Sequence, residues 1–230
     1  MMRTTPAASN SCRYTLEMLA IRLMCFPKSA HILNSVGTAT IIDHVQITNS
    51  KYDGIGMYGG LVDMNNIVSY DAGRTDFPIS YDYQGNIQFI TAMRIENTAM
   101  PTGTAYDLEI INQTTSDITT TPLTQPVISN LTVLGPNYCS PTTVNSQFDY
   151  AVHFTIASAG KIYNSVFSAW KSTATHSGLL MDKATCFNNT ASRDFIFSYN
   201  SFDRSGTGTA YFDGALTPWS GAGCSSSMAV

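Results

Sequence analysis

Residues 53–89 concentrate the residue types that could do chemistry in this 230-residue chain. Paired carboxylates, about 5–10 Å apart across a sugar bond, supply the acid and the base or nucleophile of a glycosidase. Tyrosine combines an apolar ring, which can stack on a sugar face, with a polar hydroxyl. The aspartates are Asp53, Asp63, Asp71, Asp76 and Asp82, and the tyrosines are Tyr58, Tyr70, Tyr81 and Tyr83. Carbohydrate chemistry or carbohydrate binding is therefore the first hypothesis for this stretch.

Three of these acids, Asp53, Asp76 and Asp82, are the catalytic candidates. Asp53 and Asp76 are 23 residues apart, so they would stack on one edge of a fold that repeats with that period. Aspartate is also a common corner residue, because its side chain hydrogen-bonds its own backbone. Arg74 and Arg94 could approach the same edge, where a surface ion pair is the ordinary outcome. The corner role is favoured, and no catalytic pair is assigned.

The four tyrosines are the ligand-binding candidates, because they share these segments with the acids. The alternative is that Tyr58, Tyr70, Tyr81 and Tyr83 pack inside or along the fold, and the sequence favours this packing. Other motifs give weaker evidence of function. The histidines lack metal-binding spacings, and no phosphate-binding glycine loop occurs. No cofactor is predicted.

Composition excludes several classes of partner. Charged residues make up 12% of the chain, the net charge is −4 and lysines and arginines do not cluster. Nucleic-acid binding would need a basic stripe, so we expect no nucleic-acid partner. No apolar run approaches the roughly 20 residues that span a bilayer, so we expect no membrane span.

A repeat of short apolar runs predicts the fold class. Successive runs are separated by 22, 22, 21 and 21 residues, counted from Val45, Ile67, Phe89, Ile110 and Leu131. A period of 20–25 residues with strands in each repeat is typical of a solenoid. Asparagine and glycine recur at the corners, where left-handed backbone is needed. We predict an all-β chain that forms a single-stranded right-handed parallel β-helix of about seven coils.

The chain divides into three predicted parts. Residues 1–34 form an N-terminal extension, residues 35–213 the β-helix domain and residues 214–230 a C-terminal tail that frays. In residues 14–26 apolar side chains recur at helix-like spacing, so a short helix or a poorly ordered segment is expected there. Charged residues interrupt this run, so it is not a convincing signal peptide.

The five cysteines are an odd number without a CxxC pair. They predict neither a zinc site nor redox chemistry. A disulfide between Cys139 and Cys186 and isolated buried thiols both remain open, and the thiols are favoured.

Residues 35–189 resemble a known family. The run VGTATIIDHVQITNSKYDGIGMYGGLVDMNNIVSYDAGRTDFPISYDYQGNIQF (36–89) is similar to the middle of the large secreted pectin-lyase-like β-helix proteins of Bacteroidota, and so are PVISNLTVLGP (126–136) and KIYNSVFSAW (161–170). The resemblance implies a secreted or cell-surface protein of unknown biochemical function. It also implies that this chain is an internal piece of a longer member.

The chain departs from the family in its acidic turns. Only Asp53 remains where the family has two Asp and a Glu, and Asp76 alone remains of several Asp in the next acidic corner. Calcium prefers six to eight oxygen ligands, several of them carboxylate. Asp53 and Asp76 are thus the metal candidates of a largely depleted site.

Three functional hypotheses follow. The first is a non-catalytic secreted or cell-surface β-helix protein, structural or carbohydrate-adhering, which acts as a monomer on a polysaccharide or cell-surface glycan. The second is a polysaccharide lyase or hydrolase of the pectate-lyase-like type. The third is a non-functional fragment of a longer β-helix protein, whose open ends would expose edge strands.

Overall fold

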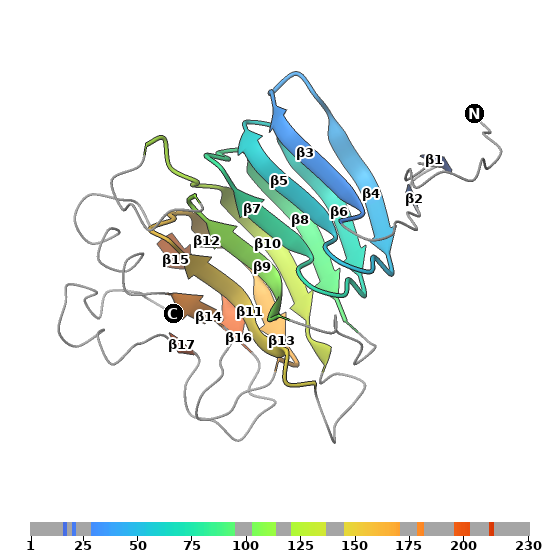
Figure 1. The fold of residues 1–230 in the computed structure, drawn as a ribbon, viewed down its shortest axis with the longest axis vertical. Helices are drawn as coiled ribbons and strands as arrows, with labels where there is room; N and C mark the ends of the chain where they lie inside the picture. Colours follow the sequence, from blue (N-terminus) through green and yellow to red (C-terminus); the bar gives the residue numbers. More distant parts are fainter. Residues whose placement is uncertain are drawn as a thin grey trace.

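Two parallel β-sheets form the body of the protein (Figure 1). The computed structural model describes residues 16–17, 20–21, 29–94, 103–113, 121–136, 145–170, 179–181, 196–202 and 212–213. The chain alternates between the two sheets, so that each coil contributes a strand to one sheet and then to the other. Every strand pair within these sheets is parallel. This is a parallel β-helix, and the predicted fold class is confirmed.

The first sheet carries the candidate site described below. Its strands are β3 (His31–Val36), β5 (Ile55–Gly60), β7 (Phe77–Ser80), β9 (Ala105–Ile111), β11 (Phe148–Thr155), β14 (Leu179–Met181) and β17 (Phe212–Asp213). The second sheet contains β4 (Ile42–Thr48), β6 (Met64–Tyr70), β8 (Asn86–Met93), β10 (Val127–Leu134), β12 (Lys161–Tyr163), β13 (Val166–Ser168), β15 (Ile196–Ser198) and β16 (Ser201–Phe202). The described strands thus form six coils, and β17 begins a seventh.

The predicted period holds only for the first coils. Val45 pairs with Ile67 as expected, but Ile67 pairs with Ile90, which follows the predicted Phe89. Phe89 has a φ of 53° and is 54% exposed. Its left-handed backbone turns the side chain outward, and the next residue takes the core position. Ile110 lies in the first sheet, so its place in the predicted column is wrong.

A column of left-handed residues bends every coil within the second sheet. The residues at this bend all have φ between 49° and 58°: His44, Asn66, Phe89, Asn130, Asn164 and Tyr199. Three of the six are asparagines, which tolerate this conformation better than most residues. Asn66 Nδ2 also donates a hydrogen bond of 2.9 Å to Asp43 Oδ1 of the preceding coil. The asparagine-rich corners of the sequence therefore mark where the coils turn.

Stacked apolar side chains fill the space between the sheets. One column of the first sheet runs through Leu33, Met57, Ile79, Ile110 and Phe154, which are in register and buried. Each such side chain contributes roughly 1.5–3 kcal/mol when it is fully buried. Because side chains alternate along a strand, the strand neighbours of these buried residues point away from the core. The outward-pointing residues of β3 and β5 form part of the candidate site.

The N-terminal segment differs from its prediction. In residues 14–26 the structure describes β1 (Leu16–Glu17) and β2 (Ala20–Ile21), which pair antiparallel, and the expected helix does not form at these four residues. The helix-like spacing of apolar residues indicates one apolar face, but the antiparallel pairing of β1 with β2 fixes an extended backbone at these residues. The predicted boundary at residue 35 falls inside β3.

Cys139 and Cys186 lie outside the described residues, as does the whole predicted tail, residues 214–230. Within the described part of the chain, no helix has the length and apolar character needed to cross a membrane.

Candidate functional site: a cleft on the first sheet

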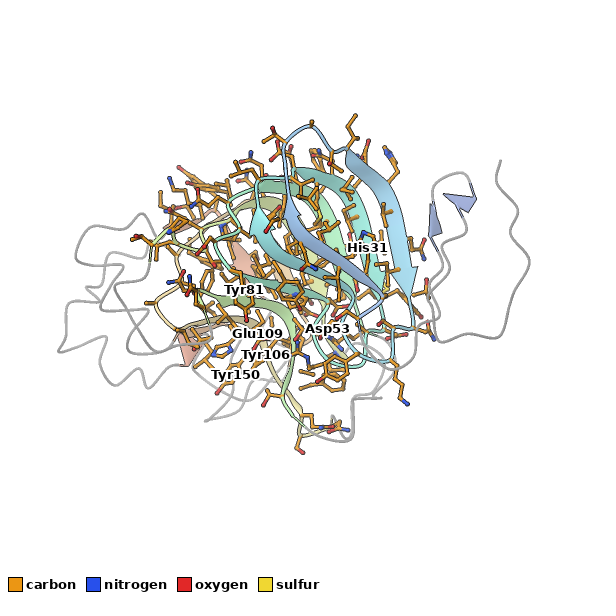
Figure 2. The ribbon with its side chains drawn as sticks, turned by 45° about the horizontal axis from the view of Figure 1, so that its top comes forward. His31, Asp53, Tyr81, Tyr106, Glu109 and Tyr150 are labelled. Carbon is orange, nitrogen blue, oxygen red and sulfur yellow. The ribbon has the colours of Figure 1, made fainter. Side chains whose placement is uncertain are left out.

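A cleft of about 940 Å³ opens over the outer face of β3 and β5. It forms where outward residues of these strands meet the corners that precede and follow them. Its lining residues are Ser29, Ile32, Asn34, Ser35, Tyr52, Asp53, Tyr58, Arg74 and Tyr81, of which Asp53 and Tyr81 are labelled in Figure 2. Residues of β3 and β5 thus converge with residues that precede β3, β5 and β7 and with Tyr81, which follows β7, although the sequence separates them by up to about 50 positions.

Two of the four predicted tyrosines line this cleft together. The rings of Tyr58 and Tyr81 lie 6.1 Å apart, centroid to centroid, and are tilted by 59°. Tyr81 is 46% exposed. Gly56 makes room for Tyr58, because a Cβ at that position would lie 2.6 Å from Tyr58 Cε2. Desolvation by burial, with the charge of Asp53 second, raises the pKa of Tyr58, so its hydroxyl stays neutral.

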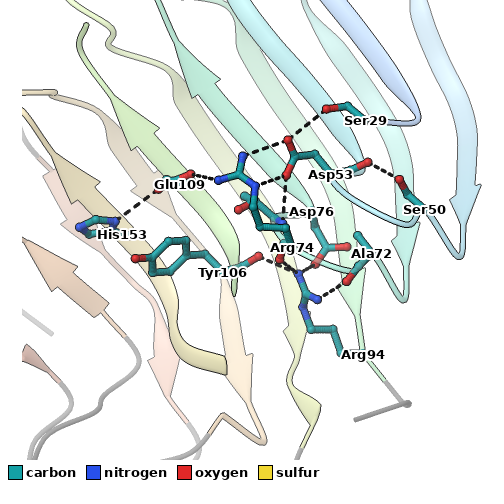
Figure 3. Close-up of polar contacts among 11 residues, drawn as sticks. Ser29, Ser50, Asp53, Ala72, Arg74, Asp76, Arg94, Tyr106, Glu109 and His153 are labelled. Carbon is teal, nitrogen blue, oxygen red and sulfur yellow. Dashed lines mark hydrogen bonds and ion pairs between the residues drawn. The ribbon is translucent and has the colours of Figure 1, made fainter. Parts of the chain in front are cut away.

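Arg74 joins two carboxylates at the edge of the cleft (Figure 3). Its Nε and Nη2 donate to the two oxygens of Asp53 at 2.7 and 2.9 Å, and its Nη1 donates to Glu109 Oε2 at 3.2 Å. The guanidinium also lies 5.1 Å from the ring centroid of Tyr52. Partial burial lowers the pKa of Arg74, but hydrogen bonding and the charge of Asp53 raise it further, so Arg74 remains a cation.

The Asp53 carboxylate is satisfied on both oxygens. Besides Arg74, the Ser29 hydroxyl donates to Oδ2 at 3.0 Å and the Thr75 N–H donates to Oδ1 at 3.3 Å. Asp53 is only 3% exposed. This set of donors fixes the position of the Asp53 carboxylate as a hydrogen-bond acceptor.

Asp53 and Asp76 do not form the stacked pair that their spacing predicts. The register that aligns Met57 with Ile79 places Thr75 beside Asp53. Asp76 is the next residue, and it is completely buried. A shift of one residue along an extended chain turns the side chain to the opposite side. Only Asp53 therefore faces the cleft.

Asp76 belongs to a second, interior cluster around Arg94, which is 1% exposed. Arg94 Nη2 forms an ion pair with Asp76 Oδ2 at 2.6 Å, and Arg94 Nε donates to Asp107 Oδ1 at 3.0 Å. Ser69 Oγ donates to Asp76 Oδ1 at 2.5 Å, and the Trp170 indole N–H donates to Asp107 Oδ2. Arg94 is therefore a buried structural residue and does not take part in the surface ion pair that the sequence favoured.

Burial acts on both interior carboxyls. Desolvation raises the pKa of Asp76, and it raises the pKa of Asp107 well above its ordinary value, although the charge of Arg94 acts in the opposite direction in both cases. The charge of Asp76 also raises the pKa of Asp107. Neighbouring carboxyls disfavour each other's ionisation, so this effect adds to that of burial.

The remaining candidates lie apart from the cleft. Asp82 sits at a corner with a φ of 67°, where its N–H donates to Thr124 Oγ1 at 3.0 Å. Tyr83 is buried in the core, and its hydroxyl donates to the Val62 carbonyl at 2.7 Å. Tyr70 is the last residue of β6 in the second sheet, where it is in register with Thr48 of β4 and Met93 of β8. The structure therefore brings Asp53, Tyr58 and Tyr81 together and leaves these three elsewhere.

Glu109 of β9 is the residue that the sequence analysis missed. It is 35 residues from Arg74, and a long coil brings the two together. On its other side, Glu109 Oε1 lies 3.7 Å from His153 Nδ1, whose ring stacks on Tyr106 at 4.8 Å (Figure 3). In LEII (108–111), Glu109 stands between the buried Leu108 and Ile110, so its side chain points to the other side of the strand. This alternation is the sequence signal that could have identified Glu109.

The candidate calcium ligands do not fit a calcium site. Asp53 is bound by the guanidinium of Arg74 and Asp76 by that of Arg94, so a cationic side chain already compensates each carboxylate. Calcium needs several such oxygens on one centre. Among the described residues, no group of three or more His, Cys, Asp or Glu side chains is arranged to hold a metal ion.

Comparison with known proteins identifies the family. The family model for the pectate-lyase-like β-helix domain matches residues 30–211, from just before β3 to just before β17. No curated protein and no solved structure matches the chain. The match covers most of the sequence and agrees with the two parallel sheets described above. This chain therefore belongs to the pectate-lyase-like β-helix domain family.

Proposed function

We propose that this protein is a non-catalytic, carbohydrate-binding β-helix protein and that the cleft over β3 and β5 is its saccharide site. The observation that carries the proposal is the pairing of Tyr58 with Tyr81 in a cleft that the fixed Asp53–Arg74 pair also lines. Aromatic rings offer a sugar its apolar contact, and fixed polar groups orient its hydroxyls.

The dimensions and the family both support this proposal. Sites for small molecules typically have volumes of about 300–1,000 Å³, and the cleft, at about 940 Å³, can hold several sugar units. Pectate-lyase-like domains are often extracellular, where polysaccharides are the common ligands. We therefore place the protein outside the cell or at the cell surface, in line with the resemblance to secreted proteins of Bacteroidota.

The positions of the acids favour binding over catalysis. A catalytic carboxylate must be free to exchange a proton or to attack the substrate. Asp53 is bound on both oxygens, Asp76 is sealed in the interior and Asp82 belongs to a corner. The lyase or hydrolase hypothesis would thus need Glu109 or His153 as its reactive group, and it becomes an outcome of the test below.

A glycan array of plant, bacterial and animal polysaccharides, probed with the labelled protein, tests the proposal. We expect wild-type protein to bind a limited set of glycans, and Tyr58→Ala and Tyr81→Ala to reduce that binding at least about tenfold, the scale of one lost stacking contact. Tyr199→Ala is the matched control, because Tyr199 is 84% exposed at the bend of the second sheet, outside the cleft.

Two further readings decide between the alternatives. Each bound glycan is incubated with the protein and assayed for new reducing ends and for unsaturated sugar, and we expect neither. Product release that Glu109→Gln abolishes would replace the proposal with the enzyme hypothesis. Thermal unfolding accompanies the array, and a chain that aggregates without a cooperative transition and binds no glycan would support the fragment hypothesis instead.

A further inference from the structure

We propose that the cleft selects uncharged saccharides and discriminates against acidic, uronate-containing ones. This inference rests on the proposed function, because it names the class of sugar that the same site accepts. It follows from how the charges at the cleft are already paired.

The cleft offers a uronate no unpaired cation. Of the described residues that line it, Arg74 is the one cation and Asp53 the one anion. Arg74 also contacts Glu109, at 3.2 Å, so two carboxylates share one guanidinium. The three side chains together carry a net charge of −1. A third carboxylate, brought by a ligand, would meet repulsion from two neighbours and attraction from one.

The geometry of Arg74 points the same way. A guanidinium recognises a carboxylate best through two parallel N–H bonds from one edge. Arg74 uses Nε and Nη2 in this manner on Asp53, at 2.7 and 2.9 Å, and uses Nη1 on Glu109. A uronate would have to displace a carboxylate that is 3% exposed and that Ser29 and Thr75 also hold. The fork of Arg74 is therefore occupied by the protein itself.

The other lining groups suit neutral hydroxyls. Asn34 and Ser35 extend from β3 into the cleft and have uncharged donors and acceptors. The Tyr58 hydroxyl stays protonated, because burial raises its pKa. The rings of Tyr58 and Tyr81 can stack on the apolar face of charged and uncharged sugars alike, so they contribute to binding in either case. The selection consequently comes from the Asp53–Arg74–Glu109 group.

Matched ligands that share a backbone and differ at C6 by a carboxylate or an uncharged group provide the test. Galacturonan hexamers are compared with their methyl esters, and glucan and mannan hexamers with their C6-oxidised forms, by isothermal titration calorimetry at low ionic strength. For each backbone that binds, we expect the neutral member to bind about tenfold tighter or more. Equal or tighter binding of the acidic member would overturn this inference and leave the proposed function standing. Failure of every member to bind would overturn the proposed function and this inference together.

A charge variant then locates the effect. Glu109→Gln keeps the shape of the side chain, makes the group neutral overall and weakens the hold on Arg74 Nη1. We expect the acidic member of each pair to gain about tenfold in affinity and the neutral member to change less than twofold.

Asp43→Asn is the matched control, because Asp43 lies in β4 of the other sheet, where it contacts His44 and Asn66. It should change neither affinity. Asp53→Asn is the second variant and should shift the preference in the same direction as Glu109→Gln. A gain that is equal for both members, or no gain in a variant that unfolds at the wild-type temperature, would contradict the proposal.

Discussion

Two arginines of this protein each hold a pair of carboxylates, one at the surface and one in the interior. Arg74 lies between Asp53 and Glu109 at the edge of the cleft, whereas Arg94 lies between Asp76 and Asp107 and is completely enclosed. The two groups touch, because Arg94 Nη2 donates to the backbone carbonyl of Arg74 at 2.5 Å. The same residue types therefore serve different purposes a few ångströms apart.

Burial explains the difference between them. In the interior, desolvation raises the pKa of Asp107 well above its ordinary value, although the charge of Arg94 opposes this rise. Arg94 completes the cluster with hydrogen bonds to the carbonyls of Ala72 and Tyr106. At the cleft, Asp53 and Arg74 are lining residues, and Glu109 contacts Arg74 from β9. The interior group thus joins neighbouring coils, whereas the group at the cleft is the one that we propose to select the ligand.

Removal of the two arginines should separate these roles most clearly. Arg94→Met leaves two carboxyls buried without their cation, and we expect it to lower the free energy of unfolding by about 3–5 kcal/mol. Arg74→Met should cost only about 1–2 kcal/mol, because Arg74 is itself partly exposed and Asp53 keeps Ser29 and Thr75 as donors. Urea unfolding of both variants checks this. Equal losses would contradict the division into a structural and a binding group.

Trp170→Phe should produce the next largest change. The indole N–H donates to Asp107, and the ring packs edge-on against Phe148 with centroids 6.3 Å apart. Phenylalanine keeps much of the packing but removes the donor, so we expect a loss of about 1–3 kcal/mol. Urea unfolding of this variant checks the loss, and an unchanged unfolding midpoint would show that Asp107 does not depend on the indole.

The pH dependence of stability sharpens the comparison further. Because folding raises the pKa of Asp107, the folded state binds this proton more tightly than the unfolded state does. The stabilisation is complete below the ordinary aspartate pKa of about 3.9 and is lost as pH rises through the raised pKa of the folded state. Asp76 acts in the same direction.

Asp107→Asn should flatten this decline, and Glu109→Gln, the corresponding change at the cleft, should leave it in place. Thermal unfolding between pH 4 and pH 9 measures both. A decline of the same size in Asp107→Asn would show that another group causes it.

Gly56→Ala is expected to change stability least. The added Cβ would lie 2.6 Å from Tyr58 Cε2, at the far end of a side chain that can rotate away. We expect a loss of less than about 1 kcal/mol together with loss of saccharide binding, because the ring leaves its place beside Tyr81. Urea unfolding and calorimetric titration check the two effects. Full binding in this variant would show that the position of Tyr58 does not matter.

The sequence predicts the parallel β-helix because strand-sized apolar runs and asparagine corners repeat. It places Val45 and Ile67 in register, and then loses the register at Phe89, where the left-handed bend adds an outward residue. Beyond this point the coils lengthen: Ile90 pairs with Leu131, 41 positions later. A fixed period cannot follow coils of unequal length.

The unequal length of the coils also explains why only part of the candidate site is predicted from the sequence. Asp53, Tyr58 and Tyr81 fall in the regular first coils, and the stretch that contains them does form the cleft. Asp76 is one position out of register with Asp53, which moves it from the surface to the interior. Glu109 lies beyond the first lengthened coil, so its contact with Arg74 could not be read from spacing. Contacts between coils of different length need the structure.

The most direct test of saccharide binding in the cleft is a calorimetric titration of the wild-type protein and Tyr58→Ala with the neutral hexamers of glucan, mannan and esterified galacturonan. We expect saturable binding of at least one hexamer to the wild type and a loss of about tenfold or more in Tyr58→Ala. Saturable binding that Tyr58→Ala leaves unchanged, or no binding of any hexamer by the folded protein, would contradict it.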